Sequence, residues 1–210
     1  VERGARSVRL LPVWEVETGS LITRRTGRRL AAAGLRGVCG LSTTGGDVLG
    51  DVAGPASATT IRQLATQTSG LPRLPVHFNP GDPLDPYADL TEERLLASLA
   101  DLPPLTSGSH LYSNFGFMLL AVLLTKVGER TYEDLLQERV CVPAGLTATS
   151  TVIPSGGALP GYDGLDQVPN WNRLPGSGGV ISTLADVARH LRLVLGPSRT
   201  TTMAPEGRST

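Results

Sequence analysis

The side chains that could perform chemistry are few and scattered along this chain. His77, His110 and His190 show no metal-ligand spacing, and Cys39 and Cys141 lie far apart. Both cysteines fit core packing, and a disulfide between them is neither indicated nor excluded. No G-x-S-x-G or phosphate-binding glycine motif occurs. The sequence therefore predicts no metal and no cofactor, and a Ser-His-Asp triad built on His110 is an alternative with little behind it.

Two further polar residues have a structural explanation beside the chemical one. Asp186 could be a catalytic acid, but it lies three residues after Thr183, with which it forms a capping box that begins a helix. Ser69 could be a nucleophile, but it stands in a Ser-Gly-Leu-Pro turn. We predict a structural role for both.

Tyr112 and Asn114 stand in a polar loop directly before the longest apolar run, Phe115 to Leu124. That run is about half the length of a membrane span and predicts a buried core helix without a membrane anchor. By themselves, the two residues fit a buried tyrosine beside a helix N-cap asparagine.

Capping residues predict the helices that must position these groups. One begins at Thr60 with Gln63 and ends at Gly70 and Pro72, and another begins at Thr91 with Leu95, Leu96 and Leu99 as its apolar stripe. A third begins at Thr131 with Asp134, has Tyr132, Leu135, Leu136 and Val140 on one face and ends at Pro143. The last begins at Thr183, buries Leu184, Val187, Ala188, Leu191 and Leu195, and ends at Gly196.

Strand signals are limited to Val13 to Val16 and Gly179 to Ile181. The Pro- and Asp-rich stretch 72 to 89 predicts a long surface loop. Residues 154 to 178 are rich in Gly, Pro, Asp and Asn, and long loops of this kind often border a site.

Three segments together resemble a known family in order and approximate spacing. They are TTIRQLATQTSGLPRLP at 59 to 75, LYSNFGFMLLAVLLTKVGERTYEDLLQERVCVPAGL at 111 to 146, and GSGGVISTLADVARHLRLVL at 176 to 195. The first resembles the helix and "THTSGLP" loop of beta-lactamase-related serine hydrolases, with Gln67 where histidine is common. The others resemble the family's Tyr-Ser-Asn loop with its core helix and its "aGGl.ST..D" segment. The resemblance implies an α+β, beta-lactamase/transpeptidase-like fold, mostly its helical region with an incomplete antiparallel sheet.

The resemblance also implies catalytic roles. In this family a serine attacks a carbonyl to give an acyl-enzyme, a lysine three residues later on the same helix face helps to remove its proton, and a tyrosine transfers protons. Tyr112 matches that tyrosine, and Asn114 matches the amide that holds substrate or the lysine. Ser20 is the best candidate nucleophile, because VWEVETGS at 13 to 20 is similar to the family's "fEiGSvtK".

The chain departs from the family pattern after Ser20. The lysine expected three residues after Ser20 is absent, and Arg24 stands one position later. Lys126 is the only lysine in the sequence, and no S-x-x-K occurs. An arginine stays protonated and cannot serve as the base. The Arg-rich segment 24 to 46 is atypical, and we hypothesise a local change of reading frame or sequence decay. Translating the coding DNA in its other frames tests this; failure to recover an S-x-x-K and an apolar helix counts against it.

Composition limits the partners. The formal net charge is zero, so there is no overall basic field for nucleic acid, and the N-terminal arginines fit a solvated segment. We expect a single domain over 1 to 196, a disordered tail over 197 to 210, and no signal peptide pattern at the start, although the family resemblance implies a periplasmic or extracellular location. The family's C-terminal Lys-Thr-Gly or His-x-Gly strand is expected to be missing.

These observations predict a serine hydrolase of this family acting on a beta-lactam, a D-alanyl peptide or a small ester, impaired by its missing lysine. The alternative is an inactive remnant or binding protein on the same scaffold. The expected partner is a small molecule or peptide; the oligomeric state is left open.

Overall fold

The computed structural model describes residues 8–9, 39–155, 157–159, 161–163, 165–168 and 175–195. Its α-helices are α3 (Gly45–Leu49), α4 (Ile61–Ala65), α5 (Glu92–Ala100), α6 (Asn114–Gly128), α7 (Tyr132–Leu136), α8 (Val142–Ala144) and α9 (Leu184–Leu195). Segments Gly50–Ala56 and Pro175–Ser177 are 3-10 helices, and Gln137–Cys141 is a π-helix. Its strands are β1 (Val8–Arg9), β2 (Gly161–Asp163), β3 (Asp166–Val168) and β4 (Ile181–Ser182).

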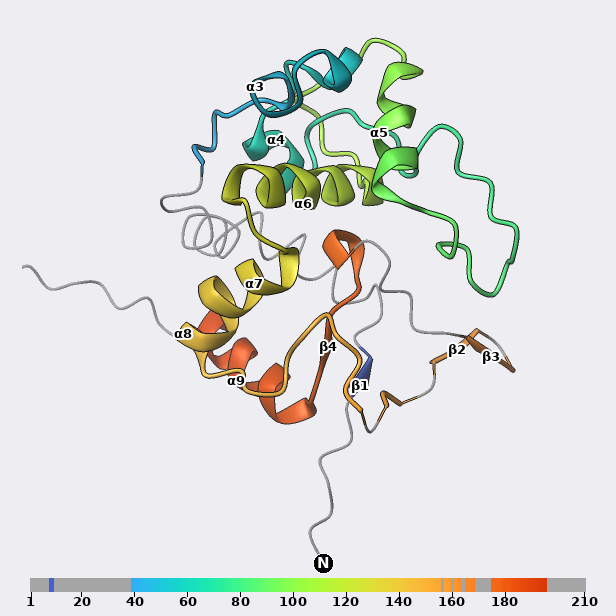
Figure 1. The fold of residues 1–210 in the computed structure, drawn as a ribbon. Helices are drawn as coiled ribbons and strands as arrows, with labels where there is room; N and C mark the ends of the chain where they lie inside the picture. The colour runs from blue at the N-terminus through green and yellow to red at the C-terminus, as the bar shows by residue number, and fades with distance from the viewer. Residues whose placement is uncertain are drawn as a thin grey trace, which may run out of the picture.

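Helix α6 is the centre of the hydrophobic core, as its apolar sequence predicts. Phe115 and Leu123 are fully buried, and the helix contacts α4 through Leu64 and α5 through Leu95, all in one core cluster. Figure 1 shows α3, α4 and α5 gathered on one side of α6, with α7, α8 and α9 on the other. None of the described helices is both long and apolar enough to cross a membrane.

The predicted helix starts at Thr60, Thr91 and Thr131 are confirmed. Each threonine hydroxyl accepts a hydrogen bond from the backbone N–H three residues later, as in the capping motif. The ends were harder to predict: α4 ends at Ala65, before Gly70, because Gln67 has a left-handed backbone with φ of 58° that cannot continue a right-handed helix.

Pro143 does not end the helix that begins at Thr131, contrary to the prediction. The chain passes from α7 into the π-helix and then into α8, which has Pro143 in its first turn. Proline is tolerated in the first turn of a helix, because the N–H that it lacks would have no intrahelical partner there. The helix ends instead at Gly145, which has a left-handed φ of 65°.

The buried side of α9 was predicted only in part. Val187, Ala188 and Leu191 are partly buried, but Leu184 is 70% exposed. Among the α9 residues whose burial is described, Asp186 and His190 are the most deeply buried. Thr183 does accept from the Asp186 backbone N–H at 3.3 Å, but the Asp186 carboxylate points to another segment instead of completing a capping box. Because Asp186 and His190 lie four residues apart on one face, the buried stripe is polar, and hydrophobicity alone could not reveal it.

The described β structure consists of small antiparallel pairs. β1 pairs with β4, and Ser150 makes an isolated bridge to Ile181 on the same strand. β2 pairs with β3 in a separate hairpin, which Figure 1 shows apart from β1 and β4. The strand predicted at Gly179 to Ile181 is therefore confirmed with its start two residues later, while the one predicted at Val13 to Val16 lies outside the described residues.

Candidate active site

A turn and a loop, far apart in sequence, are joined by hydrogen bonds at the N-terminal end of α6. We call the turn 67–73 and the loop 106–115 together the turn-loop junction. Backbone N–H groups of the loop donate to carbonyl oxygens of the turn: Gly108 to Thr68 at 2.9 Å, Leu111 to Gln67 at 2.8 Å, and Phe115 to Arg73 at 3.2 Å. These hydrogen bonds with the turn thus fix the position of the loop that carries the predicted site residues Tyr112 and Asn114.

One glycine and one serine of the turn explain why the turn and the loop approach each other so closely. Gly70 has a φ of 78°, and a Cβ there would lie 2.4 Å from the carbonyl oxygen of Thr106. Only glycine fits this approach. Ser69 is 1% exposed, and its Oγ accepts from the Leu71 N–H at 3.3 Å, which is the turn role predicted for it.

Ser113 is the residue that caps α6, so Asn114 is its first helical residue and not its N-cap. The Ser113 Oγ accepts from the Gly116 N–H at 2.8 Å and donates to the Pro72 carbonyl at 2.6 Å. The structural explanation of Asn114 as an N-cap is therefore wrong. Its side chain is left available for another role.

Only one of the two polar atoms of the Asn114 side-chain amide has a hydrogen-bond partner. Its Nδ2 donates to the Tyr87 hydroxyl at a long 3.4 Å, and its Oδ1 is buried without a hydrogen-bond partner. A buried acceptor without a partner costs roughly 1–3 kcal/mol and therefore calls for an explanation, of which a catalytic or binding role is one. Asn114 therefore presents a carboxamide oxygen ready to accept from a donor.

Tyr112 lies two residues before Asn114 in the same loop and is partly buried. The Arg73 guanidinium carbon stands 5.7 Å from the centroid of its ring, within the range of a cation–π contact. Tyr112 and Asn114 thus stand in one loop anchored to the turn, whereas Ser20 lies outside the described residues, and the catalytic roles of all three stay predictions.

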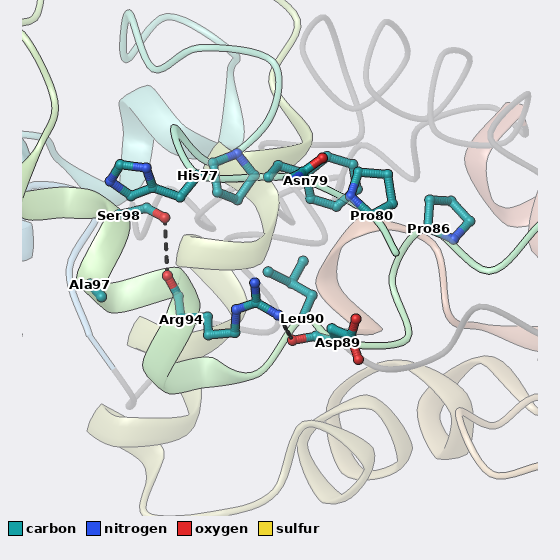
Figure 2. A pocket seen from close by; sticks show the side chains of 11 residues that line it. His77, Asn79, Pro80, Pro86, Asp89, Leu90, Arg94, Ala97 and Ser98 are labelled. Atoms are coloured by element: carbon teal, nitrogen blue, oxygen red, sulfur yellow. Dashed lines mark hydrogen bonds between the residues drawn. The ribbon is translucent and has the colours of Figure 1, made fainter. Parts of the chain in front are cut away.

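The long loop 72 to 89 contributes an aromatic pair that the sequence did not reveal as part of the site. Tyr87 accepts from Asn114, and its ring packs against Phe78 with centroids 5.3 Å apart. Phe78 also lines a cavity of about 170 Å³ between this loop and α5. Figure 2 shows Pro80 and Asn79 of the loop on one side of that cavity and Arg94 and Ser98 of α5 on the other.

The remaining polar candidates have other environments. His77 forms an exposed pair with Asp101 at 2.7 Å, and His110 is an exposed residue within the loop 106–115. Burial lowers the pKa of His190, which lies on α9. Cys39 and Cys141 are both free thiols. Within the part of the chain that the structure describes, no three His, Cys, Asp or Glu side chains gather in a way that could hold a metal ion.

Asp186 and Glu133 form a second polar cluster with segment 148–151. We call these two carboxylates and the segment the carboxylate clamp. Asp186 accepts from the Ala148 N–H at 2.8 Å and the Thr149 hydroxyl at 2.9 Å. Glu133 accepts from Thr151 and from the Ser150 hydroxyl. The carboxylate of Asp186 is therefore a structural acceptor, in agreement with a structural role and not with catalysis.

Comparison with known proteins places this arrangement in a family. The beta-lactamase family model matches residues 36–210, so the chain belongs to the beta-lactamase family. The D-alanyl-D-alanine-carboxypeptidase/endopeptidase AmpH of Escherichia coli K12 is 30% identical over 140 residues, which are 65% of this chain and 36% of AmpH. The chain thus spans about a third of the length of this curated relative.

Solved structures agree with the fold. A class C beta-lactamase from Rhodobacter sphaeroides superposes with a TM-score of 0.67 at 25% identity, over 96% of this chain and 54% of that one. A beta-lactamase/D-alanine carboxypeptidase from Pseudomonas syringae gives 0.68 at 19% identity, over 93% and 52%. The predicted α+β, beta-lactamase/transpeptidase-like fold with a small antiparallel sheet is confirmed.

Proposed function

We propose that this chain carries the proton-transfer side of a serine hydrolase site that acts through an acyl-enzyme on a beta-lactam, a D-alanyl peptide or a small ester. The observation that carries the proposal is that one anchored loop holds Tyr112 and, two residues later, the Asn114 Oδ1 that has no hydrogen-bond partner. A carboxamide oxygen that lacks a donor is suited to an ammonium or to a substrate N–H. The family of the chain and the names of its relatives support the same chemistry.

The proposed roles follow from these groups. Ser20 Oγ attacks the substrate carbonyl and forms an ester, while its proton passes by way of Tyr112 to the leaving nitrogen or oxygen as that bond breaks. Water then hydrolyses the ester and restores the serine. Asn114 holds the substrate during both steps. Loop 72 to 89 forms a wall beside Asn114 through Tyr87.

The position of the only lysine does not suit a general base beside Tyr112. Lys126 is the only lysine, and it lies twelve positions after Asn114, ~18 Å along the helix axis. Its Nζ pairs with Glu92 at 2.8 Å, in the last turn of α6, whereas Tyr112 precedes the first turn. This position favours the second candidate function: a protein on the same scaffold that binds such ligands without turning them over.

A labelling experiment separates the two candidates. Purified protein is incubated with a fluorescent penicillin and, separately, with an activated ester, beside Ser20→Ala, Tyr112→Phe and Asn114→Ala. If the chain is a hydrolase, we expect a covalent label on the wild type and none on Ser20→Ala. Tyr112→Phe and Asn114→Ala should become labelled on the order of tenfold to a hundredfold more slowly. Tyr162→Phe is the matched control, since Tyr162 is 58% exposed. Reversible binding without any covalent label would support the binding protein, and labelling that survives Ser20→Ala would contradict the role of Ser20.

A further inference from the structure

Gln67 has an unusual backbone for its residue type. Its side chain is 1% exposed, and its φ of 58° lies in the left-handed region, which is costly for any residue with a Cβ. Among the described residues, Glu129 is the other non-glycine residue with such a φ, and it ends α6, where a left-handed residue is a common helix cap. Glycine would adopt either backbone without this cost, so the Gln67 side chain must contribute enough to offset it.

The contribution is visible in the loop of Tyr112. The backbone N–H of Leu111 donates to the Gln67 carbonyl oxygen at 2.8 Å, and the N–H of Ser113 donates to the Gln67 Oε1 at 2.8 Å. The residues before and after Tyr112 are thus both bound through their backbone N–H groups to one buried residue.

We propose that Gln67 is a positioning residue for Tyr112, acting by accepting hydrogen bonds on both sides of it. The proposal rests on the proposed function, in which Tyr112 transfers protons. The acceptor is the essential part of the side chain, because Nε2 is buried without a partner. A histidine ring nitrogen can accept in the same way, whereas a methionine of similar shape cannot.

Amide hydrogen exchange tests the anchoring without any need for catalysis. In the wild type, the amides of Leu111 and Ser113 are expected to be protected. In Gln67→Met the Ser113 amide should exchange on the order of tenfold faster, while the Leu111 amide, bonded to the backbone, keeps its protection. Gln67→His should restore slow exchange at Ser113. Fast exchange at Ser113 in the wild type would overturn the proposal even if Gln67→Met failed to fold.

A spectroscopic signature separates positioning of Tyr112 from general support of the fold. The chain has four tyrosines, so protein labelled with 3-fluorotyrosine gives a simple ¹⁹F spectrum, in which Tyr112→Phe identifies the resonance of Tyr112. Gln67→Met should move or broaden this resonance more than those of Tyr132 and Tyr162, and Gln67→His should return it. A lower melting temperature with the Tyr112 resonance unmoved would make Gln67 merely structural. If the resonance moves but no variant, wild type included, is labelled by penicillin or ester, the positioning stands and the hydrolase proposal fails.

Discussion

The turn-loop junction and the carboxylate clamp are both polar clusters that hold a segment in place, but they use different groups. The junction is held by neutral groups, with Gln67 and Ser113 bonding to backbone amides and carbonyls. The clamp is held by charged groups, with Asp186 and Glu133 as acceptors for segment 148–151. Both residue pairs are of types that catalysis uses, so residue type alone does not distinguish the two clusters.

The difference lies in how completely each cluster is satisfied. Each oxygen of Asp186 and Glu133 accepts at least one hydrogen bond, including one from Arg189 to Asp186 at 2.7 Å. In the junction, the Asn114 Oδ1 and the Gln67 Nε2 have no partner. A satisfied polar cluster is best understood as structure, whereas a buried group without a partner calls for an explanation. This contrast assigns the candidate site to the junction.

The largest expected effect is that of breaking the clamp at Asp186. Asp186→Ala leaves the Ala148 N–H and the Thr149 hydroxyl without their acceptor in a buried place, and should lower the free energy of unfolding by about 3 kcal/mol. Urea denaturation measures this. The matched control is Asp134→Ala, an exposed N-terminal helix residue that should cost about 0.5–1 kcal/mol. Equal losses in the two variants would show that the clamp is not specially stabilising.

The junction should break at Gly70. Gly70→Ala places a Cβ against the Thr106 carbonyl and strains the left-handed backbone, so we expect a loss of about 2 kcal/mol or more, measured by urea denaturation. Gly108→Ala is the control: Gly108 also has a positive φ, of 111°, but a Cβ there meets nothing within 4 Å, so its loss should be about 1 kcal/mol. If Gly108→Ala costs as much as Gly70→Ala, the close approach to Thr106 is not what matters.

The two clusters should also differ in their response to acid. Burial by itself raises the pKa of Glu133, but hydrogen bonds from Thr151, Gln137 and Ser150 outweigh it and leave the pKa lowered. A carboxylate with a lowered pKa stabilises the fold above its unfolded value of 4.5, and this contribution is lost as the pH falls through the folded pKa. Denaturation curves from pH 6 to 3 should therefore decline less steeply in Glu133→Gln than in the wild type. Parallel curves would contradict the role of the charge.

We expect Cys141, in the π-helix beside the clamp, to make the fold less stable at alkaline pH. Burial, together with the charges of Glu133 and Asp186, raises the pKa of Cys141 to about 11. Because the folded state holds the proton more tightly than the unfolded state, stability is complete below the ordinary thiol value of 9.0 and declines as the pH rises toward 11. Cys141→Ala should remove this decline, as seen in denaturation at pH 8 and 10.5. A decline that persists in Cys141→Ala would assign the effect to other groups.

What could be predicted from the sequence was local. The caps at Thr60, Thr91 and Thr131 were predictable because each links residues three apart. The Tyr112 loop was found because a motif is contiguous. The anchoring of Ser113 by Gln67 joins residues 46 apart and needed the structure, although the glutamine in place of the usual histidine was a signal at that position. The clamp was missed because a polar stripe on α9 violates the hydrophobic pattern from which buried faces are predicted.

The smallest effect is expected when the two residues with a left-handed backbone are replaced by glycine. Glu129 is exposed, and Gln67 is buried in the junction. Glu129→Gly removes the backbone strain at the end of α6, where the Glu129 side chain is exposed, and should raise the free energy of unfolding by about 0.5–1 kcal/mol. Gln67→Gly removes the same strain but also deletes the acceptor for Ser113 and leaves a space in the core, so it should lower stability by about 1 kcal/mol or more. Opposite signs in urea denaturation would show that the strain at Gln67 is outweighed by its side chain. If both substitutions stabilise, the Oε1 bond contributes less than the strain costs, and the loop of Tyr112 is held by the backbone bonds of the junction instead.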